Sequence, residues 1–222
     1  MNRVLRLAAA GVSLSLVCGC GILDTKVSPS QHQYSLGGPN NPVTLAATRP
    51  RAPATGMTLI VSPPHAAAGF DSPRMMYVRQ EGKLEYFAYN EWIDTPARML
   101  SPLIIAALQG SGAFRAVVER PTTAAGDLRL DTEILRLQQE FLSKPSQVRF
   151  TLRAYIVESS TRRVVATRDF ETTVSADSEN PQGGVLAANR AVQAILAQLT
   201  DFCAQAAGTA IAVTAADSKT AR

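Results

Sequence analysis

The chain has 222 residues, which is enough for one sizeable domain with an apolar core. Its 22 Lys and Arg residues and 18 Asp and Glu residues give a net charge of only +4, and no cluster of basic residues is present, which argues against a nucleic-acid-binding surface. Two of the basic residues, Arg3 and Arg6, precede the first predicted element, and subtracting them from +4 leaves +2 for the rest of the chain.

The first predicted element is an apolar segment, Leu7–Val17, which ends at Val17-Cys18-Gly19-Cys20. Its 11 residues suit a signal peptide, since a membrane-spanning helix needs about 20 residues. The ending resembles a bacterial lipobox, with an aliphatic residue, two small residues and then a cysteine. The sequence therefore predicts a signal peptide over residues 1–19 and Cys20 as the lipidation site, where the sulfur takes a diacylglycerol in thioether linkage. An ordinary secretory signal is the alternative, but no small-x-small site directly follows the apolar segment.

The predicted lipidation bears on location and on cysteine chemistry. Gly21 stands where inner-membrane lipoproteins of well-studied Gram-negative bacteria carry Asp, which favours the periplasmic face of the outer membrane. Cleavage would remove Cys18 and acylation would occupy Cys20, so Cys203 is left without a disulfide partner. Cys203 lies in a helical apolar pattern, which predicts a buried structural thiol and not a nucleophile.

Residues 20–56 are expected to form the lipidated N-terminus and a flexible tether. They include Gly37-Gly38-Pro39-Asn40-Asn41-Pro42 and few bulky apolar side chains, a composition that buries too little surface to offset the entropy lost on ordering. Tyr34-Ser35-Leu36 interrupts this composition and predicts a short strand near residues 34–36. The folded domain is expected over residues 57–203.

Apolar residues at alternate positions predict the strands of this domain. These strands are Met57–Val61, Met75–Arg79, Lys83–Tyr89, Phe114–Glu119, Leu128–Leu135, Phe150–Ile156 and Val164–Val174. Glu81-Gly82 is expected to form a hairpin turn between the second and third strands. A slip in the alternation at Ile134-Leu135 predicts a β-bulge. The last three strands are long and joined by short links, which predicts an antiparallel meander.

Two stretches with helical periodicity predict two helices. The first is capped by Asp94 or Thr95, has Pro96 at its first position, and ends at Gly110; Pro102 implies a later start or a kink. The second opens at residues 180–184 and runs to Phe202, and residues 204–222 are expected to be a disordered tail. The predicted fold class is α+β, a single domain with a mostly antiparallel sheet and two main helices packed on one side.

The polar residues predict no catalytic site, no metal and no cofactor. Five charged residues are expected on one wet sheet surface as cross-strand ion pairs, a paired-carboxylate site being the alternative: Arg129, Asp131, Glu133, Arg149 and Arg153. His32 and His65 have no second ligand at metal-binding spacing. Gly183-Gly184 opens a helix and could bind an anion, but a plain loop-to-helix turn is the simpler interpretation.

Aromatic residues concentrate on the predicted hairpin and just beyond it. Strand alternation places Tyr86 on one side and Phe87 with Tyr89 on the other, and one of these sides must face the core. The other could present rings to a partner, as interfaces often do. The alternative is that both sides are covered within the fold or that tyrosines simply lie at the surface. The candidate partner-binding residues are Tyr77, Tyr86, Tyr89 and Trp92.

From Tyr34 to Phe202 the chain resembles the ABC-type transport auxiliary lipoproteins, the PqiC-like group. The order and spacing of mostly structural positions carry the resemblance. These positions are Tyr34-Ser35-Leu36 after Cys20, Phe70-Asp71-Ser72-Pro73, Tyr77-Val78-Arg79, Leu84-Glu85-Tyr86, Trp92 followed by Pro96, Leu108 with Ser111-Gly112 and Phe114, and the closing amphipathic helix. The chain departs from the group in having Phe202 where a Trp is frequent, and in a longer Pro/Gly stretch before Met57.

The resemblance implies a non-enzymatic accessory role. Such lipoproteins work with an ABC ATPase, a permease and an MCE-domain protein that bridges the periplasm, in a system that moves lipids or other hydrophobic molecules between the inner and outer membranes. The lipoprotein would sit under the outer membrane and dock the end of the MCE assembly. Homo-oligomerisation into a ring stays open. The alternatives are a structural lipoprotein that maintains envelope integrity without transport, and a periplasmic hydrolase.

Overall fold

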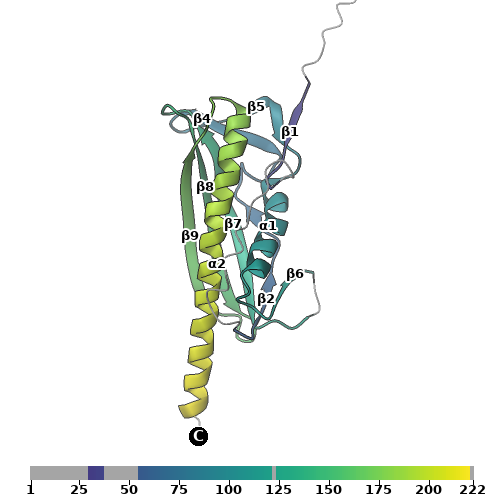
Figure 1. The fold of residues 1–222 in the computed structure, drawn as a ribbon, viewed down its shortest axis with the longest axis vertical. Coiled ribbons are helices and arrows are strands. Elements are labelled where there is room, and N and C mark those ends of the chain that lie inside the picture. The colour runs from purple at the N-terminus through teal and green to yellow at the C-terminus, as the bar shows by residue number, and fades with distance from the viewer. Residues whose placement is uncertain (1–29, 38–54, 122–123, 221–222) are drawn as a thin grey trace, which may run out of the picture. The chain divides into compact units, whose positions relative to one another are not determined.

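The computed structural model describes residues 30–37, 55–121 and 124–220, and the side chains as far as residue 211. This part of the chain contains nine strands and two helices (Figure 1). The strands are β1 (His32–Tyr34), β2 (Thr58–Val61), β3 (His65–Ala66), β4 (Arg74–Gln80), β5 (Lys83–Trp92), β6 (Ala116–Glu119), β7 (Leu128–Glu140), β8 (Gln147–Glu158) and β9 (Val164–Ser175). The helices are α1 (Pro96–Gly110) and α2 (Pro181–Thr220).

The sheet is arranged around β7. β8 pairs with it antiparallel over its whole length, and β9 pairs antiparallel with β8, which confirms the predicted meander. On its other side β7 pairs with β2, β3 and β4, all in parallel. β6 adds to β2, whereas β5 and then β1 add to β4. The longest pairings are antiparallel, so the α+β prediction is confirmed, but the sequence did not predict the short parallel pairings.

The predicted β-bulge lies in β7. Ile134 is paired with Leu152 and Arg136 with Thr151, so Leu135 is the extra residue between them. The bulge changes which alternate positions face the core. Even-numbered residues, Thr132 and Ile134, are buried before it, and odd-numbered residues, 137 and 139, are buried after it. One strand can therefore cover the core along its whole length while its other side stays polar.

α1 begins and ends where the sequence predicts. The Thr95 hydroxyl accepts a hydrogen bond from the backbone N–H of Arg98 at 3.4 Å, and Pro96 occupies the first turn, where its missing N–H has no helical partner to lose. At the other end the Ser111 hydroxyl donates to a carbonyl oxygen of the last turn at 2.6 Å. The helix starts at Pro96 and contains Pro102, so the later start that Pro102 could imply is wrong.

α2 is longer than predicted. It opens with the Asn180 side chain accepting a hydrogen bond from the Gly183 N–H at 2.9 Å, which is an N-cap. It then continues to Thr220, so the expectation of a disordered tail over residues 204–222 is wrong as far as that residue. Alanine is the best helix former, and Ala206 and Ala207 are buried against the sheet, so small side chains suffice to extend the packed side of the helix.

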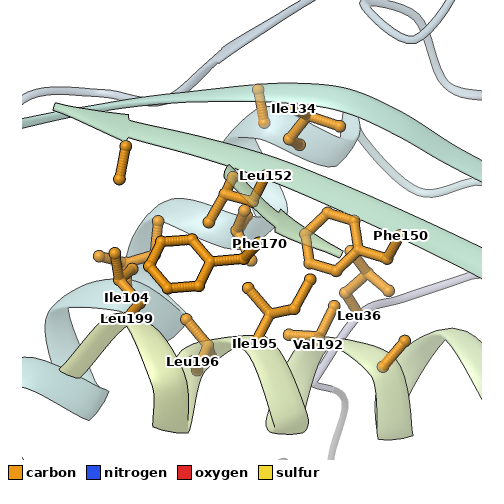
Figure 2. Packing of buried hydrophobic residues seen from close by; sticks show 14 of the residues in the cluster. Leu36, Ile104, Ile134, Phe150, Leu152, Phe170, Val192, Ile195, Leu196 and Leu199 are labelled. Carbon is orange, nitrogen blue, oxygen red and sulfur yellow. The ribbon is translucent and has the colours of Figure 1, made fainter. Parts of the chain in front are cut away.

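The core lies between the sheet and the two helices (Figure 2). α2 lays one side on the meander, with α1 beside it. The residues labelled there include Val192, Ile195, Leu196 and Leu199 of α2, Phe150, Leu152 and Phe170 of the meander, and Ile104 of α1. Phe170 also meets Phe202 edge-on, with ring centroids 5.7 Å apart. Burying a side chain of this size contributes about 1.5–3 kcal/mol, so this layer supplies most of the stability.

The folded part starts before residue 57, where the sequence analysis placed its boundary. β1 pairs with β5 and lies two residues earlier than the strand predicted near 34–36. Leu36 is 4% exposed and belongs to the core, and the Asn189 side chain accepts a hydrogen bond from the Gly37 N–H at 2.8 Å. This docking joins residues far apart in the chain, so no local pattern could reveal it. Residues 38–54, the rest of the expected tether, lie outside the described part.

Candidate functional site: the β4–β5 hairpin

The hairpin that carries most of the candidate partner-binding residues forms as predicted. Gln80 and Lys83 are paired, so Glu81-Gly82 makes a two-residue turn, and Gly82 has φ 75°, a backbone conformation that glycine adopts without strain. On the far side of the hairpin, the Phe141 N–H donates to the Val78 carbonyl oxygen at 2.8 Å. The turn Gln80–Lys83 and the β7–β8 loop, Phe141–Ser146, therefore lie at the same end of the sheet; we call these two segments the tip.

The two sides of the hairpin have different surroundings. Tyr77 pairs with Gln139 of β7, whose side chain packs against Gly184 at the start of α2, so Tyr77 lies on the side of the helices. There the rings of Tyr77 and Phe87 are 4.5 Å apart, and Phe141 stands edge-on to Tyr77 at 5.9 Å. These three half-buried rings support one another at the margin of the core.

The opposite side of the hairpin is more exposed. Val78 pairs with Leu84, and Met76 with Tyr86, and this side continues into Glu140 of β7. Tyr86 is 51% exposed and Leu84 is 42% exposed. The guanidinium of Arg74 lies over the Tyr86 ring, 4.4 Å from its centroid, which holds the ring at the surface.

The four candidate residues therefore have different positions. Tyr86 and Tyr89 are the accessible ones, since Tyr89 is 52% exposed. Tyr77 is half-buried in the ring cluster. Trp92, at 4% exposure, is a core residue and cannot present its ring to a partner in this conformation. Distance from the turn separates Trp92 from Tyr86 and Tyr89, because β5 enters the core at its end. Tyr77 and Tyr86 are equally close to the turn and differ in the side of the hairpin on which they lie.

Charges on the hairpin are paired with one another. Arg79 donates two hydrogen bonds to Glu85, at 3.2 and 2.9 Å, and Lys83 lies 3.4 Å from the same carboxylate. The hydrogen bond from Arg79 is the main cause that lowers the pKa of Glu85 below its ordinary value. Arg79 also lies 5.1 Å from the centre of the Tyr77 ring. Glu85 is thus shared by two cations, Arg79 and Lys83, and the rest of the hairpin surface offers mainly apolar and aromatic groups.

The side of the meander that faces away from the helices carries the predicted ion pairs, with partners that differ in part. Arg149 bridges Glu140 at 2.9 Å and Glu171 at 2.7 Å. Arg153 pairs with Asp169 of β9 at 2.8 Å, although Glu133 stands opposite it on β7. We call this surface the charged face; it comprises Arg129, Asp131, Glu140, Arg149, Arg153, Asp169 and Glu171.

The acidic and basic residues of the charged face form ion pairs with one another. Arg129 and Asp131, two residues apart on β7, are paired at 2.8 Å. Burial alone would raise the pKa of Glu140, but hydrogen bonds from Arg149 and Gln138 outweigh it and lower that pKa below its ordinary value. A carboxyl group held ionised in this way is suited to structural pairing and poorly suited to donate a proton.

Other chemical groups of the described part also have structural roles. Cys203 is fully buried, and this burial raises the pKa of its thiol well above the ordinary range, so the prediction of a structural thiol is confirmed. Within residues 30–37, 55–121 and 124–220, no three His, Cys, Asp or Glu side chains are grouped to hold a metal ion. No helix of that part has the length and apolar character needed to cross a membrane. Cys20 lies outside it.

The comparison with known families bears on this fold directly. The sequence profile of the ABC-type transport auxiliary lipoprotein components matches residues 34–200, from the end of β1 well into α2. The chain belongs to this family. The resemblance stated from the sequence is thereby confirmed, and the elements that build the hairpin, the charged face and the core all fall within the matched residues. No curated protein sequence matches the chain.

Solved structures share the fold of this family member. Protein XCC0632 from Xanthomonas campestris has a TM-score of 0.67 and 24% identity, over 72% of this chain and 90% of its own. A crystal structure described only as an uncharacterized protein has a TM-score of 0.60 and 11% identity, over 78% and 99%. Lipoprotein GNA1162 from Neisseria meningitidis has 14% identity over 65% and 99%, and its TM-score of 0.36 supports no inference. At these identities the likenesses show the fold alone.

Proposed function

We propose that this protein is a non-enzymatic accessory subunit of an MCE-type ABC transport system, anchored through Cys20 to the periplasmic face of the outer membrane. It would dock the end of an MCE-domain protein and, through it, act with the permease and ATPase that move lipids or other hydrophobic molecules between the two membranes. The observation that carries the proposal is the family match over residues 34–200, because it spans the folded part from β1 to α2.

Two features of the structure support a docking role. The carboxylates of the charged face form ion pairs with arginines of the same face, so these pairs account for their presence without a substrate. The hairpin, in contrast, exposes Tyr86 and Tyr89, and exposed tyrosines are frequent anchors of protein interfaces. These two residues are the partner-binding residues that we propose.

The test is capture of the MCE-domain protein by the full, exported lipoprotein. We expect the native chain to retain it, and a Tyr86→Ala/Tyr89→Ala variant to retain much less while the purified variant keeps its cooperative unfolding. Mass spectrometry of the mature N-terminus should show a diacylated Cys20. A native chain that binds no MCE-domain protein would count against the docking role, and a bare Cys20 would remove the anchor.

A further inference from the structure

The tip exposes apolar side chains at one end of the sheet. Leu142 of the β7–β8 loop is 50% exposed and Leu84, next to the turn, is 42% exposed. Lys83 and Lys144 flank them, and both are exposed. Loops with exposed leucines beside lysines are suited to the boundary between lipid headgroups and acyl chains, where the apolar part is buried and the ammonium groups remain in water.

The direction of β1 relates this tip to the predicted anchor. β1 runs parallel to β5, and His32 is level with Asn90. β5 starts at the turn and runs away from it, so the chain approaches His32 from the side of the tip (Figure 1). β5 is irregular between Tyr86 and Glu91, so the distance is taken along β4, where Arg74 is paired with Glu91 and Gln80 with Lys83. About five residues of β4 separate the level of His32 from the turn, which is about 17 Å.

The length of chain before β1 limits how far Cys20 can be from the folded domain. Eleven residues, Gly21–Gln31, lie between Cys20 and His32. From Cys20 to His32 even a fully extended backbone spans at most about 43 Å. Since the tip lies about 17 Å from the level of His32, an extended path that continues the direction of β1 carries Cys20 about 26 Å beyond the tip. A less extended path in the same direction leaves Cys20 nearer to the tip.

We propose that the tip is a membrane-contact site, in which Leu84 and Leu142 insert at the headgroup boundary of the bilayer that carries the acylated Cys20. The inference rests on the proposed anchor. It deepens that proposal by giving the domain a fixed orientation: the turn Gln80–Lys83 faces the lipid, and Tyr86 and Tyr89 lie below it along β5, free to meet a protein.

The cysteine content of the chain makes this orientation measurable. With Cys20 acylated and Cys203 buried, a cysteine introduced at an exposed position is the accessible thiol of the folded domain. The tip variants are Leu142→Cys and Leu84→Cys. Val164→Cys is the matched control, because Val164 is 51% exposed and begins β9, which runs parallel to β7 and therefore starts at the opposite end of the sheet. Emission from Trp92, the single tryptophan, reports that each variant is folded.

Each variant would be exported, purified with its acyl chains, labelled with an environment-sensitive fluorophore and reconstituted into vesicles of phosphatidylethanolamine and phosphatidylglycerol. We expect the emission of the two tip labels to shift to the blue on reconstitution and to be quenched by lipids brominated near the headgroup end of the acyl chain. The label at residue 164 should show neither effect.

The possible failures are distinguishable. Protein that does not float with the vesicles would overturn both the anchor and the membrane contact. Protein that floats but leaves the tip labels in water would overturn the membrane contact and leave the anchor standing. Tip labels that change only when the MCE-domain protein is added would assign the tip to a protein interface and overturn the inference.

Discussion

The charged face and the tip belong to one sheet but differ in whether their side chains find partners within the fold. On the charged face every arginine that carries a pair finds its carboxylate on the same or the neighbouring strand, as Arg149 finds Glu140 and Glu171. At the tip, Leu84 and Leu142 remain about half exposed. A surface completed by its own contacts needs no partner, whereas exposed apolar groups gain free energy when something covers them.

The comparison requires that stability depends on the apolar layer beneath the charged face and little on the ion pairs themselves. We therefore expect Phe150→Ala to lower the free energy of unfolding by about 3–5 kcal/mol, because Phe150 is fully buried between β8 and α2. Arg149→Ala, one residue away on the opposite side of β8, should cost only about 1 kcal/mol. Urea unfolding of both variants measures this difference, and equal losses would break the comparison.

The second prediction concerns the place where α2 meets β7 below the tip. A methyl group on Gly184 would overlap the buried side-chain amide of Gln139, so Gly184→Ala should destabilise the fold by about 1–3 kcal/mol. Gly208→Ala is the control in the same helix, since nothing lies near a methyl group there, and it should stabilise by up to about 1 kcal/mol. Thermal unfolding should show shifts of opposite sign, and shifts of the same sign would contradict the packing described.

The third prediction uses acid to weaken the charged face selectively. The pKa of Glu140 is lower in the folded chain than its ordinary value of 4.5, so its pairing stabilises the fold fully above that pH. This contribution is lost as the pH falls through the lowered value. Unfolding measured in a pH series should thus show a smaller loss of stability below pH 4.5 in Glu140→Gln than in the native chain. Parallel curves for the two proteins would show that ionisation of Glu140 contributes nothing to the stability of the fold.

The smallest effect on stability is expected at the hairpin. Tyr86→Ser should change the free energy of unfolding by no more than about 0.5 kcal/mol, because the ring is half exposed and its partner Arg74 is also at the surface. It should nevertheless weaken capture of the MCE-domain protein. Tyr155→Ser, which removes a half-buried ring from the meander, is the control and should leave capture unchanged. Equal loss of capture in both variants would mean that the hairpin has no special role.

Local features of the fold could be predicted from the sequence. The alternation of β7 slips at Ile134-Leu135 and the bulge is there, and Thr95 followed by Pro96 marks the start of α1. The hairpin turn and the meander were likewise predicted, because their partners are neighbours in the chain. In each case the residues that decide the structure lie within a few positions of one another.

Contacts between distant parts of the chain could not be predicted. β1 docks on β5, and β2 and β3 on β7, through backbone hydrogen bonds that any sequence can make. The burial of Trp92 and the length of α2 beyond Phe202 likewise depend on packing between elements that are far apart in the chain. Of the candidate residues, Tyr86 and Tyr89 are accessible because they lie on the part of β5 outside the core, which the strand enters only near Trp92.

The central position of β7 has a consequence for the order in which the chain acquires its structure. β2 and β3 precede their partners in the chain, since β3 pairs only with β7 among the described strands, and β2 only with β6 and β7. The first of these partners, β6, starts at Ala116, so neither strand has a partner until more than half of the 222 residues have been synthesised. The apolar residues of β2 are therefore without a strand partner during this interval. A nascent chain consequently most needs protection from aggregation before residue 140 has been added.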